Sequence, residues 1–227
     1  MSKLKKGQKG RLDGGSLQTS TFKGLLDASY DGRKSVDGFI KDDSISSKTS
    51  KVYRDPITKQ VVVAHQGTKG AKDWLNNLKF AIGGTKAYKK TRRFKEAERV
   101  QRLAEEKYGA QNISTIGHSQ GALQSEILGK NTKEILTLNK ASNPFENRSK
   151  GANQFDVRTK NDLVSKATEL FTKKKKNNGN EITLQSNSSN PLTEHSTNVL
   201  ERVDPNTTIG TGIIKRRHMK RYHIIQR

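Results

Sequence analysis

Residues 112–128 have the sequence NISTIGHSQGALQSEIL, which is the strongest indication of the fold class. Its first part, Asn112–Ile116, predicts a short strand, and Ala122–Leu128 can form the helix that follows. Between them, Gly117–Gly121 is a tight turn that matches the pattern G-x-S-x-G. A serine at such a strand-to-helix turn is held in a strained conformation between small neighbours, with its hydroxyl exposed at the top of a sheet. The pattern therefore makes Ser119 a candidate nucleophile.

Further strand and helix candidates alternate on both sides of this stretch. Two of the strands flank Asp55-Pro56, a turn signal, and so predict a hairpin. The longest helix candidate has its apolar residues on one side, and Gly109 ends it. This alternation predicts an α/β fold with a mostly parallel central sheet flanked by helices. The expected strands are Lys51–Arg54, Gln60–His65, Glu134–Leu138, Phe155–Arg158 and Glu181–Gln185, and the expected helices are Thr21–Tyr30, Arg93–Tyr108 and Asp162–Phe171.

The charge balance is strongly basic. The 227 residues include 44 Lys and Arg against 22 Asp and Glu, which gives a formal net charge of +22. Such an excess attracts polyanions, and nucleic acid and an anionic membrane surface are both candidate partners. Hydrophobic residues make up only 30% of the chain, which indicates a compact middle between polar ends. We therefore expect a basic flexible segment at 1–18, one folded domain at 19–212 and a basic, disordered tail at 213–227.

Several classes of function are disfavoured by what the sequence lacks. It contains no Cys, which excludes disulfides and thiolate catalysis. No His or carboxylate cluster has the spacing of metal ligands, so we expect neither a metal nor another cofactor. No apolar run approaches the roughly 18 residues of a transmembrane segment. The basic N-terminus does not lead into an apolar stretch, so it is not a secretory signal, and we expect a protein that acts inside a cell or is carried in a virus particle.

A second motif precedes the serine motif by about fifty residues. It consists of Val61–Thr68, with the sequence VVVAHQGT, followed by Asp73–Leu78, with the sequence DWLNNL. With the two motifs in this order, the chain resembles class 3 (fungal-type) lipases of the α/β-hydrolase superfamily, in which a strand ends in Phe-Arg-Gly-Thr or Phe-Arg-Gly-Ser and Asp-Trp follows. In this chain His65 and Gln66 stand in place of the usual Phe and Arg. The resemblance covers roughly residues 20–200 and implies that the folded domain expected at 19–212 is a lipase-like α/β-hydrolase domain.

The resemblance also implies an oxyanion hole and a lid. Thr68 would contribute its backbone N–H to the oxyanion hole, to which its hydroxyl can add, and the backbone N–H of Gln120 would complement it. Ala71–Leu78 corresponds to the lid region of such lipases. Trp74 within it is either a lid aromatic that faces lipid or a core residue.

The general base is sought among five His residues. On this fold the order along the chain is serine, acid, histidine. His195 fits that order, and the resembling lipases place their His in a loop near the C-terminus. The other four lie inside the two motifs or in the basic tail: His65, His118, His218 and His223.

The acid is expected between the serine and His195, after a strand. Asp162 follows the strand-like stretch 155–159 and begins a segment that resembles the Asp-x-Val segment of the lipases. It would hold the imidazole in the required tautomer. Asp156 is the alternative, but it lies within the strand.

These residues predict a serine-dependent carboxylic ester hydrolase without a cofactor. The family resemblance favours a lipase or phospholipase that acts on lipid acyl esters. Two alternatives remain: a thioesterase or peptidase that uses the same triad, and a non-enzymatic basic protein, associated with nucleic acid or a virion, that keeps a hydrolase-like fold.

Overall fold

The computed structural model describes residues 17–69, 85–141, 151, 153–162 and 180–210, together with the backbone of Tyr222–His223. Some sequence-based expectations lie outside these residues. They are the lid Ala71–Leu78 with Trp74, the helix Asp162–Phe171 beyond its first residue, the basic loop Lys173–Lys176, and His218.

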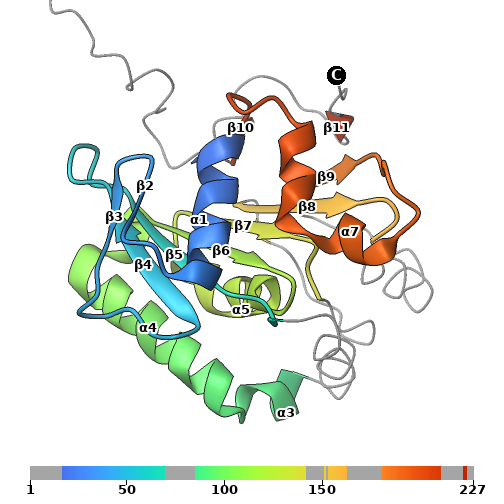
Figure 1. Ribbon diagram of the computed structural model, residues 1–227. Coiled ribbons are helices and arrows are strands. Elements are labelled where there is room, and N and C mark those ends of the chain that lie inside the picture. Colours follow the sequence, from blue (N-terminus) through green and yellow to red (C-terminus); the bar gives the residue numbers. More distant parts are fainter. Residues whose placement is uncertain are drawn as a thin grey trace, which may run out of the picture.

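The described residues form a central sheet of mixed direction (Figure 1). Its order is β11-β9-β8-β7-β6-β5-β4-β3-β2. The strands from β5 to β11 pair in parallel, whereas β2 to β5 pair antiparallel. The bounds are β2 Ser35–Val36, β3 Phe39–Lys41, β4 Ser50–Arg54, β5 Val61–His65, β6 Ile113–His118, β7 Glu134–Leu138, β8 Gln154–Thr159, β9 Asn180–Leu184 and β11 Tyr222–His223.

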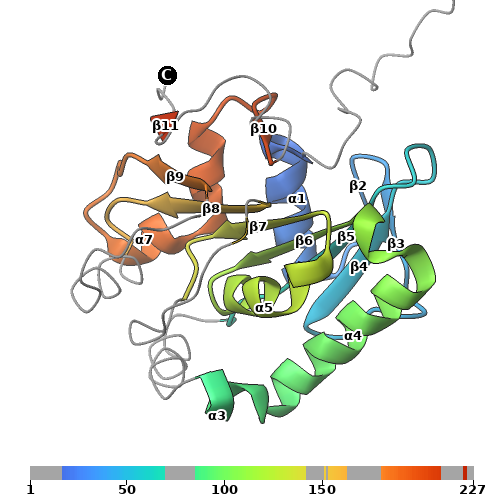
Figure 2. The same ribbon diagram turned by 180° about the vertical axis from the view of Figure 1, so that it is seen from behind.

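Helices cover both faces of this sheet. Helix α1 and the 3-10 helix η3 lie on one face, and α4 and α5 lie on the other (Figures 1 and 2). Strand β5 shows why two layers form. Its Val62 and Ala64 join the core beneath α1, whereas Val61 and Val63 pack with α4. The bounds are α1 Thr19–Asp31, α3 Thr85–Lys89, α4 Arg92–Tyr108, α5 Gln120–Leu128, α7 Pro191–His195, η1 Ala110–Asn112, η2 Gly129–Asn131 and η3 Thr197–Arg202.

The secondary structure predicted from the sequence agrees with these elements within the described residues. The hairpin is present as β4 and β5, and α4 ends at Gly109. One difference concerns the turn at residues 117–121. Strand β6 continues to His118, because its ladder with β7 extends to the pair His118 and Leu138. Helix α5 then begins at Gln120, so the turn is confined to Ser119.

Two short strands lie outside the predicted domain limits of 19 and 212, which remain a prediction. The sequence predicts that Leu17 and Gln18 belong to the flexible N-terminal segment, but they form β1, which pairs with β10 (Thr208–Ile209). The physical reason is that the Leu17 side chain is buried in the core. Strand β11 falls within the predicted tail and pairs in parallel with β9. None of the helices in the described ranges is long and apolar enough to cross a membrane.

Candidate active site

Ser119 occupies a sharp turn between β6 and α5. Its φ of 56° and ψ of −121° are strained for a residue with a side chain, at a typical cost of about 1–3 kcal/mol. The two glycines of the motif allow this turn. A Cβ on Gly117 would lie 2.4 Å from the backbone of Gly121, and a Cβ on Gly121 would lie 2.1 Å from the carbonyl oxygen of His65. The sequence pattern therefore reflects a close approach between this turn and the end of β5.

At this turn the backbone of Ser119 is hydrogen-bonded, but its side chain is not. The backbone N–H of Ser119 donates to the Leu138 carbonyl at 3.0 Å, which fixes the turn against β7. The side chain is buried, and its Oγ makes no hydrogen bond to any described residue, His195 included. In enzymes without a ligand, catalytic hydrogen bonds are often long and tighten only when substrate binds.

His195 and Asp162 are in direct contact. His195 Nδ1 lies 2.6 Å from Asp162 Oδ1, and both side chains are buried. A carboxylate at Nδ1 favours the tautomer that carries its proton there, which leaves Nε2 able to accept a proton. Asp156 lies elsewhere. Its carboxylate accepts hydrogen bonds from Lys140 at 2.9 Å and from Thr137 at 2.6 Å.

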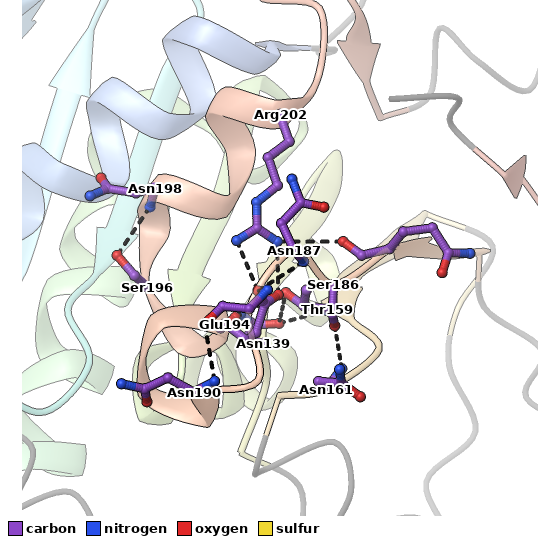
Figure 3. Close-up of polar contacts among 12 residues, drawn as sticks. Asn139, Thr159, Asn161, Ser186, Asn187, Asn190, Glu194, Ser196, Asn198 and Arg202 are labelled. Carbon is purple, nitrogen blue, oxygen red and sulfur yellow. Dashed lines mark hydrogen bonds and ion pairs between the residues drawn. The ribbon is translucent and has the colours of Figure 1, made fainter. Parts of the chain in front are cut away.

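The backbone on the N-terminal side of His195 is anchored to the ends of two strands. The carbonyl of Glu194 accepts a hydrogen bond from Asn139 Nδ2 at 2.8 Å and one from Thr159 Oγ1 at 3.0 Å (Figure 3). These two residues follow β7 and end β8. The chain at His195 is therefore fixed relative to the carboxyl edge of the parallel sheet.

The Glu194 side chain adds a second anchor. Its buried carboxylate accepts hydrogen bonds from the Arg202 guanidinium at 2.8 and 2.9 Å (Figure 3). It also accepts one from the Ser188 N–H at 2.8 Å. Burial alone would raise the pKa of Glu194, but the hydrogen bonds from Arg202 and from the backbone lower it below its usual value. The carboxylate is therefore ionised at neutral pH and can hold the segment before His195.

His118, the variable residue before the serine, connects the two sides of the site. Its Nε2 donates to the His195 carbonyl at 2.6 Å, and its Nδ1 accepts from the Tyr30 hydroxyl at 2.7 Å. The Tyr30 hydroxyl in turn accepts from the Gly67 N–H at 3.0 Å. Burial lowers the pKa of His118 to about 3, which agrees with a neutral ring that donates at one nitrogen and accepts at the other. A continuous chain of hydrogen bonds thus runs from Gly67 to His195.

The residues predicted for the oxyanion hole lie beside the serine. A Cβ on Gly67 would be 3.1 Å from the Cβ of Ser119, so the loop after β5 packs directly against the turn. The next residue, Thr68, donates from Oγ1 to Gln120 Oε1 at 3.2 Å. Gln120 begins α5, and the N–H groups of a first helical turn have no partner within the helix. This end of α5 can therefore receive a negative charge.

The other motif histidine, His65, has a different environment. It is fully buried between Ser50 Oγ at 2.8 Å and Gln101 Oε1 at 3.3 Å, and burial lowers its pKa to about 4. It is a neutral core residue. In the described part of the chain no group of three or more His, Asp and Glu is arranged to hold a metal ion.

The sequence did not identify the roles of Tyr30 and His118. Tyr30 lies near the end of α1, about ninety residues before the serine, and no local pattern marks its hydroxyl. His118 occupies a position of the motif where many residue types are allowed. Only the tertiary structure brings these two side chains between Gly67 and His195.

The chain has an α/β-hydrolase fold, with a strained serine between a parallel strand and a helix, a carboxylate after β8 and a histidine after β9. Neither a family model nor a curated protein sequence matches the chain. It is similar in structure to the Lip2 lipase from Yarrowia lipolytica, with a TM-score of 0.44 and 11% sequence identity over 73% of this chain and 77% of that one. It is also similar to a triacylglycerol lipase from Penicillium expansum, with a TM-score of 0.38 and 13% identity over 78% of this chain and 74% of that one.

Proposed function

We propose that this protein is a serine-dependent carboxylic ester hydrolase, with Ser119 as nucleophile, His195 as general base and Asp162 as its partner. The observation that carries the proposal is the 2.6 Å contact between His195 Nδ1 and Asp162, with the backbone of His195 hydrogen-bonded through His118 to the strained serine turn. A serine hydroxyl becomes an effective nucleophile only beside an oriented base.

The proposed reaction has two halves. Ser119 Oγ attacks the acyl carbonyl carbon while His195 Nε2 takes the serine proton, and the carbonyl oxygen becomes an oxyanion that the N–H groups of Thr68 and Gln120 stabilise. The intermediate collapses as His195 gives the proton to the leaving alcohol, which leaves an acyl-serine. Water then attacks the acyl carbon while His195 takes its proton. The bond from the acyl carbon to Ser119 Oγ breaks as His195 returns that proton to Oγ, which releases the carboxylic acid and restores the serine. Asp162 holds the imidazole and stabilises its charged form throughout.

Lipid acyl esters are the proposed substrate class, as for a lipase or phospholipase. This choice is supported by the resemblance of the two sequence motifs to those of class 3 lipases. A panel of esters of increasing chain length, with a thioester and a peptide of matched acyl group, tests it. Preference for the thioester or the peptide would favour the alternative hydrolase activities.

An activity-based label provides the central test. A fluorophosphonate should react with the intact chain and not with Ser119→Ala, because the reagent needs an activated serine. Ser44→Ala is the matched control, since Ser44 is exposed and lies between β3 and β4, on the other side of the sheet order from β9, and it should label like the wild type. Ester hydrolysis by Ser119→Ala should fall by several orders of magnitude without loss of fold. If the wild type neither reacts with the label nor hydrolyses any ester, the non-enzymatic alternative is favoured.

The net charge of +22 suggests where such an enzyme would act. We propose that it binds an anionic membrane surface, because each Lys or Arg near such a surface contributes about 1 kcal/mol. Binding to vesicles of anionic phospholipid should weaken steeply with salt. Duplex DNA is the competing polyanion, and a parallel titration compares the two. Tighter binding to DNA at equal salt would reject the membrane in favour of nucleic acid.

A further inference from the structure

Arg93, the second residue of α4, is a cation at the end of the helix where a positive charge is unfavourable. Thr91 caps this helix by accepting from the Phe94 N–H at 3.2 Å, so Arg93 stands in the first turn. The positive end of the helix dipole disfavours a cation there. The first turn contains no acidic residue to offset it. Helix stability therefore gives no reason for an arginine at this position.

Arg93 is also largely withdrawn from water without an ion-pair partner among the described residues. No carboxylate of the described ranges lies within ion-pair distance of its guanidinium. Burial accordingly lowers its pKa below the ordinary value for arginine. A desolvated, unpaired charge is costly unless other groups bind it.

The groups that bind Arg93 belong to the loop after β5, Gln66–Thr68, which carries the proposed oxyanion donor Thr68 and is named the oxyanion loop. Its Nη2 donates to the carbonyl of Gln66 and, at 2.8 Å, to the carbonyl of Gly67. The loop lies against Ser119, as the contact of Gly67 with the serine shows. The guanidinium therefore sits one hydrogen bond away from the backbone that would stabilise the oxyanion.

The geometry of the peptide group links this contact to the direction of the Thr68 N–H. In a trans peptide the C=O and the following N–H are coplanar and point in opposite directions. The peptide between Gln66 and Gly67 is fixed at both ends, by Arg93 on its oxygen and by Tyr30 on its N–H. In the next peptide Arg93 binds the Gly67 oxygen, so the N–H of Thr68 must point away from the guanidinium. A cation on the oxygen also polarises the peptide and strengthens that N–H as a donor.

We propose that Arg93 is a positioning residue of the oxyanion hole, which binds the Gln66 and Gly67 carbonyls and thereby aims the Thr68 N–H at the developing oxyanion. This inference rests on the proposed function. The loop itself has Gln at position 66, and Arg93 of α4 supplies a guanidinium beside it. Arg93 does not touch the substrate but acts through the backbone.

The test compares Arg93→Gln and Arg93→Lys with Arg92→Gln, using a soluble p-nitrophenyl ester. Arg92 is the matched control, because it is the preceding residue in α4 and is exposed. Arg93→Gln should lower kcat about 10- to 100-fold, less than the typical loss of a whole oxyanion donor, with KM nearly unchanged. Arg93→Lys keeps the charge but not the planar fork, so it should lose about 3- to 10-fold. Arg92→Gln should match the wild type.

A second measurement separates positioning from a merely structural role. A trifluoromethyl ketone forms a tetrahedral adduct with the serine and places an oxyanion in the hole. Its inhibition constant should rise by the same factor as kcat/KM falls, because only the transition state needs the aimed N–H. Thermal unfolding of each variant controls for loss of fold, and Arg93→Lys carries the test if Arg93→Gln does not fold.

Three outcomes would overturn the inference. The first is an unchanged kcat in a folded Arg93 variant, and the second is a loss confined to KM. The third is a lower kcat with unchanged binding of the ketone. Failure of the proposed function is recognised separately, because the wild type itself would then neither hydrolyse the ester nor react with a fluorophosphonate.

Discussion

Replacing Tyr30 by Phe tests the hydrogen-bond chain that joins the two sides of the site. The change removes only the hydroxyl, which accepts from the Gly67 N–H at 3.0 Å and donates to His118 Nδ1 at 2.7 Å. Both partners are buried, so each is left without its hydrogen bond. A buried polar group that loses its partner costs about 1–3 kcal/mol. Because Tyr30 itself is partly exposed, we take the lower part of the range, about 2–4 kcal/mol in total.

The stability assay is thermal unfolding, with urea unfolding to check that the m-value is unchanged. A loss of about 2–4 kcal/mol corresponds to a fall in Tm of roughly 5–15 °C for a domain of this size. The kcat for a soluble ester should also fall by about tenfold, because both the oxyanion loop and His195 lose a restraint.

Tyr88→Phe is the matched control. The Tyr88 hydroxyl is buried and, among the described residues, has no partner at normal hydrogen-bond geometry, only a weak polar contact with the Gln124 side chain. Its removal should leave stability unchanged or raise it slightly, since an unsatisfied polar group is lost. Equal unfolding temperatures for Tyr30→Phe and Tyr88→Phe would show that the chain through Tyr30 contributes nothing, and would refute the reasoning.

Three further predictions concern the acid, a buried lysine and the buried histidines. Asp162→Asn should lower kcat by about three to four orders of magnitude, because it favours the wrong tautomer of His195. Asp156→Asn should lower stability but leave kcat unchanged when kcat is expressed per fluorophosphonate-reactive molecule. The reverse result would exchange the roles of the two residues. Lys140→Met should cost about 3–5 kcal/mol in urea unfolding, because two buried carboxylates lose their cation. His65 and His118 have folded pKa values of about 4 and about 3, so unfolding takes up protons below the unfolded value of about 6.5. Their contribution to stability is complete above about pH 6.5. It declines by about 1.4 kcal/mol per pH unit for each residue as the pH falls toward the folded pKa values. Equal urea midpoints at about pH 7 and about pH 5 would contradict this expectation.

The parts of the fold that the sequence predicted are those fixed by local pattern. Gly117 and Gly121 lie on either side of the serine because any Cβ there would collide with neighbouring backbone. The residue types of the motif therefore predict the turn. The valine run of β5 is buried on both faces, as its composition indicated. The burial of Leu17 cannot be predicted from local pattern, because one apolar residue in a polar segment gives no periodic signal and its strand pairs with Ile209 far along the chain.

The candidate site was predictable where chain order constrained it. His195 and Asp162 followed from the order serine, acid, histidine, and the structure places them in contact. The supporting contacts depend on distances between remote segments. The hydrogen bond from His118 to His195 spans 77 residues, and that from Tyr30 to His118 spans 88. Neither residue type is unusual for its local structure, so one sequence cannot reveal these roles.

The anchoring of the Glu194 carbonyl has a consequence for folding kinetics. That carbonyl is bound by side chains at the ends of β7 and β8, while His195 itself contacts Asp162 and His118. His195 therefore reaches its place only after its own segment has docked against the ends of β6, β7 and β8. Contacts of such large sequence separation form slowly, because loop closure precedes them. During refolding, reactivity toward a fluorophosphonate should therefore appear after the sheet signal in circular dichroism, and it would report the last docking step of the domain.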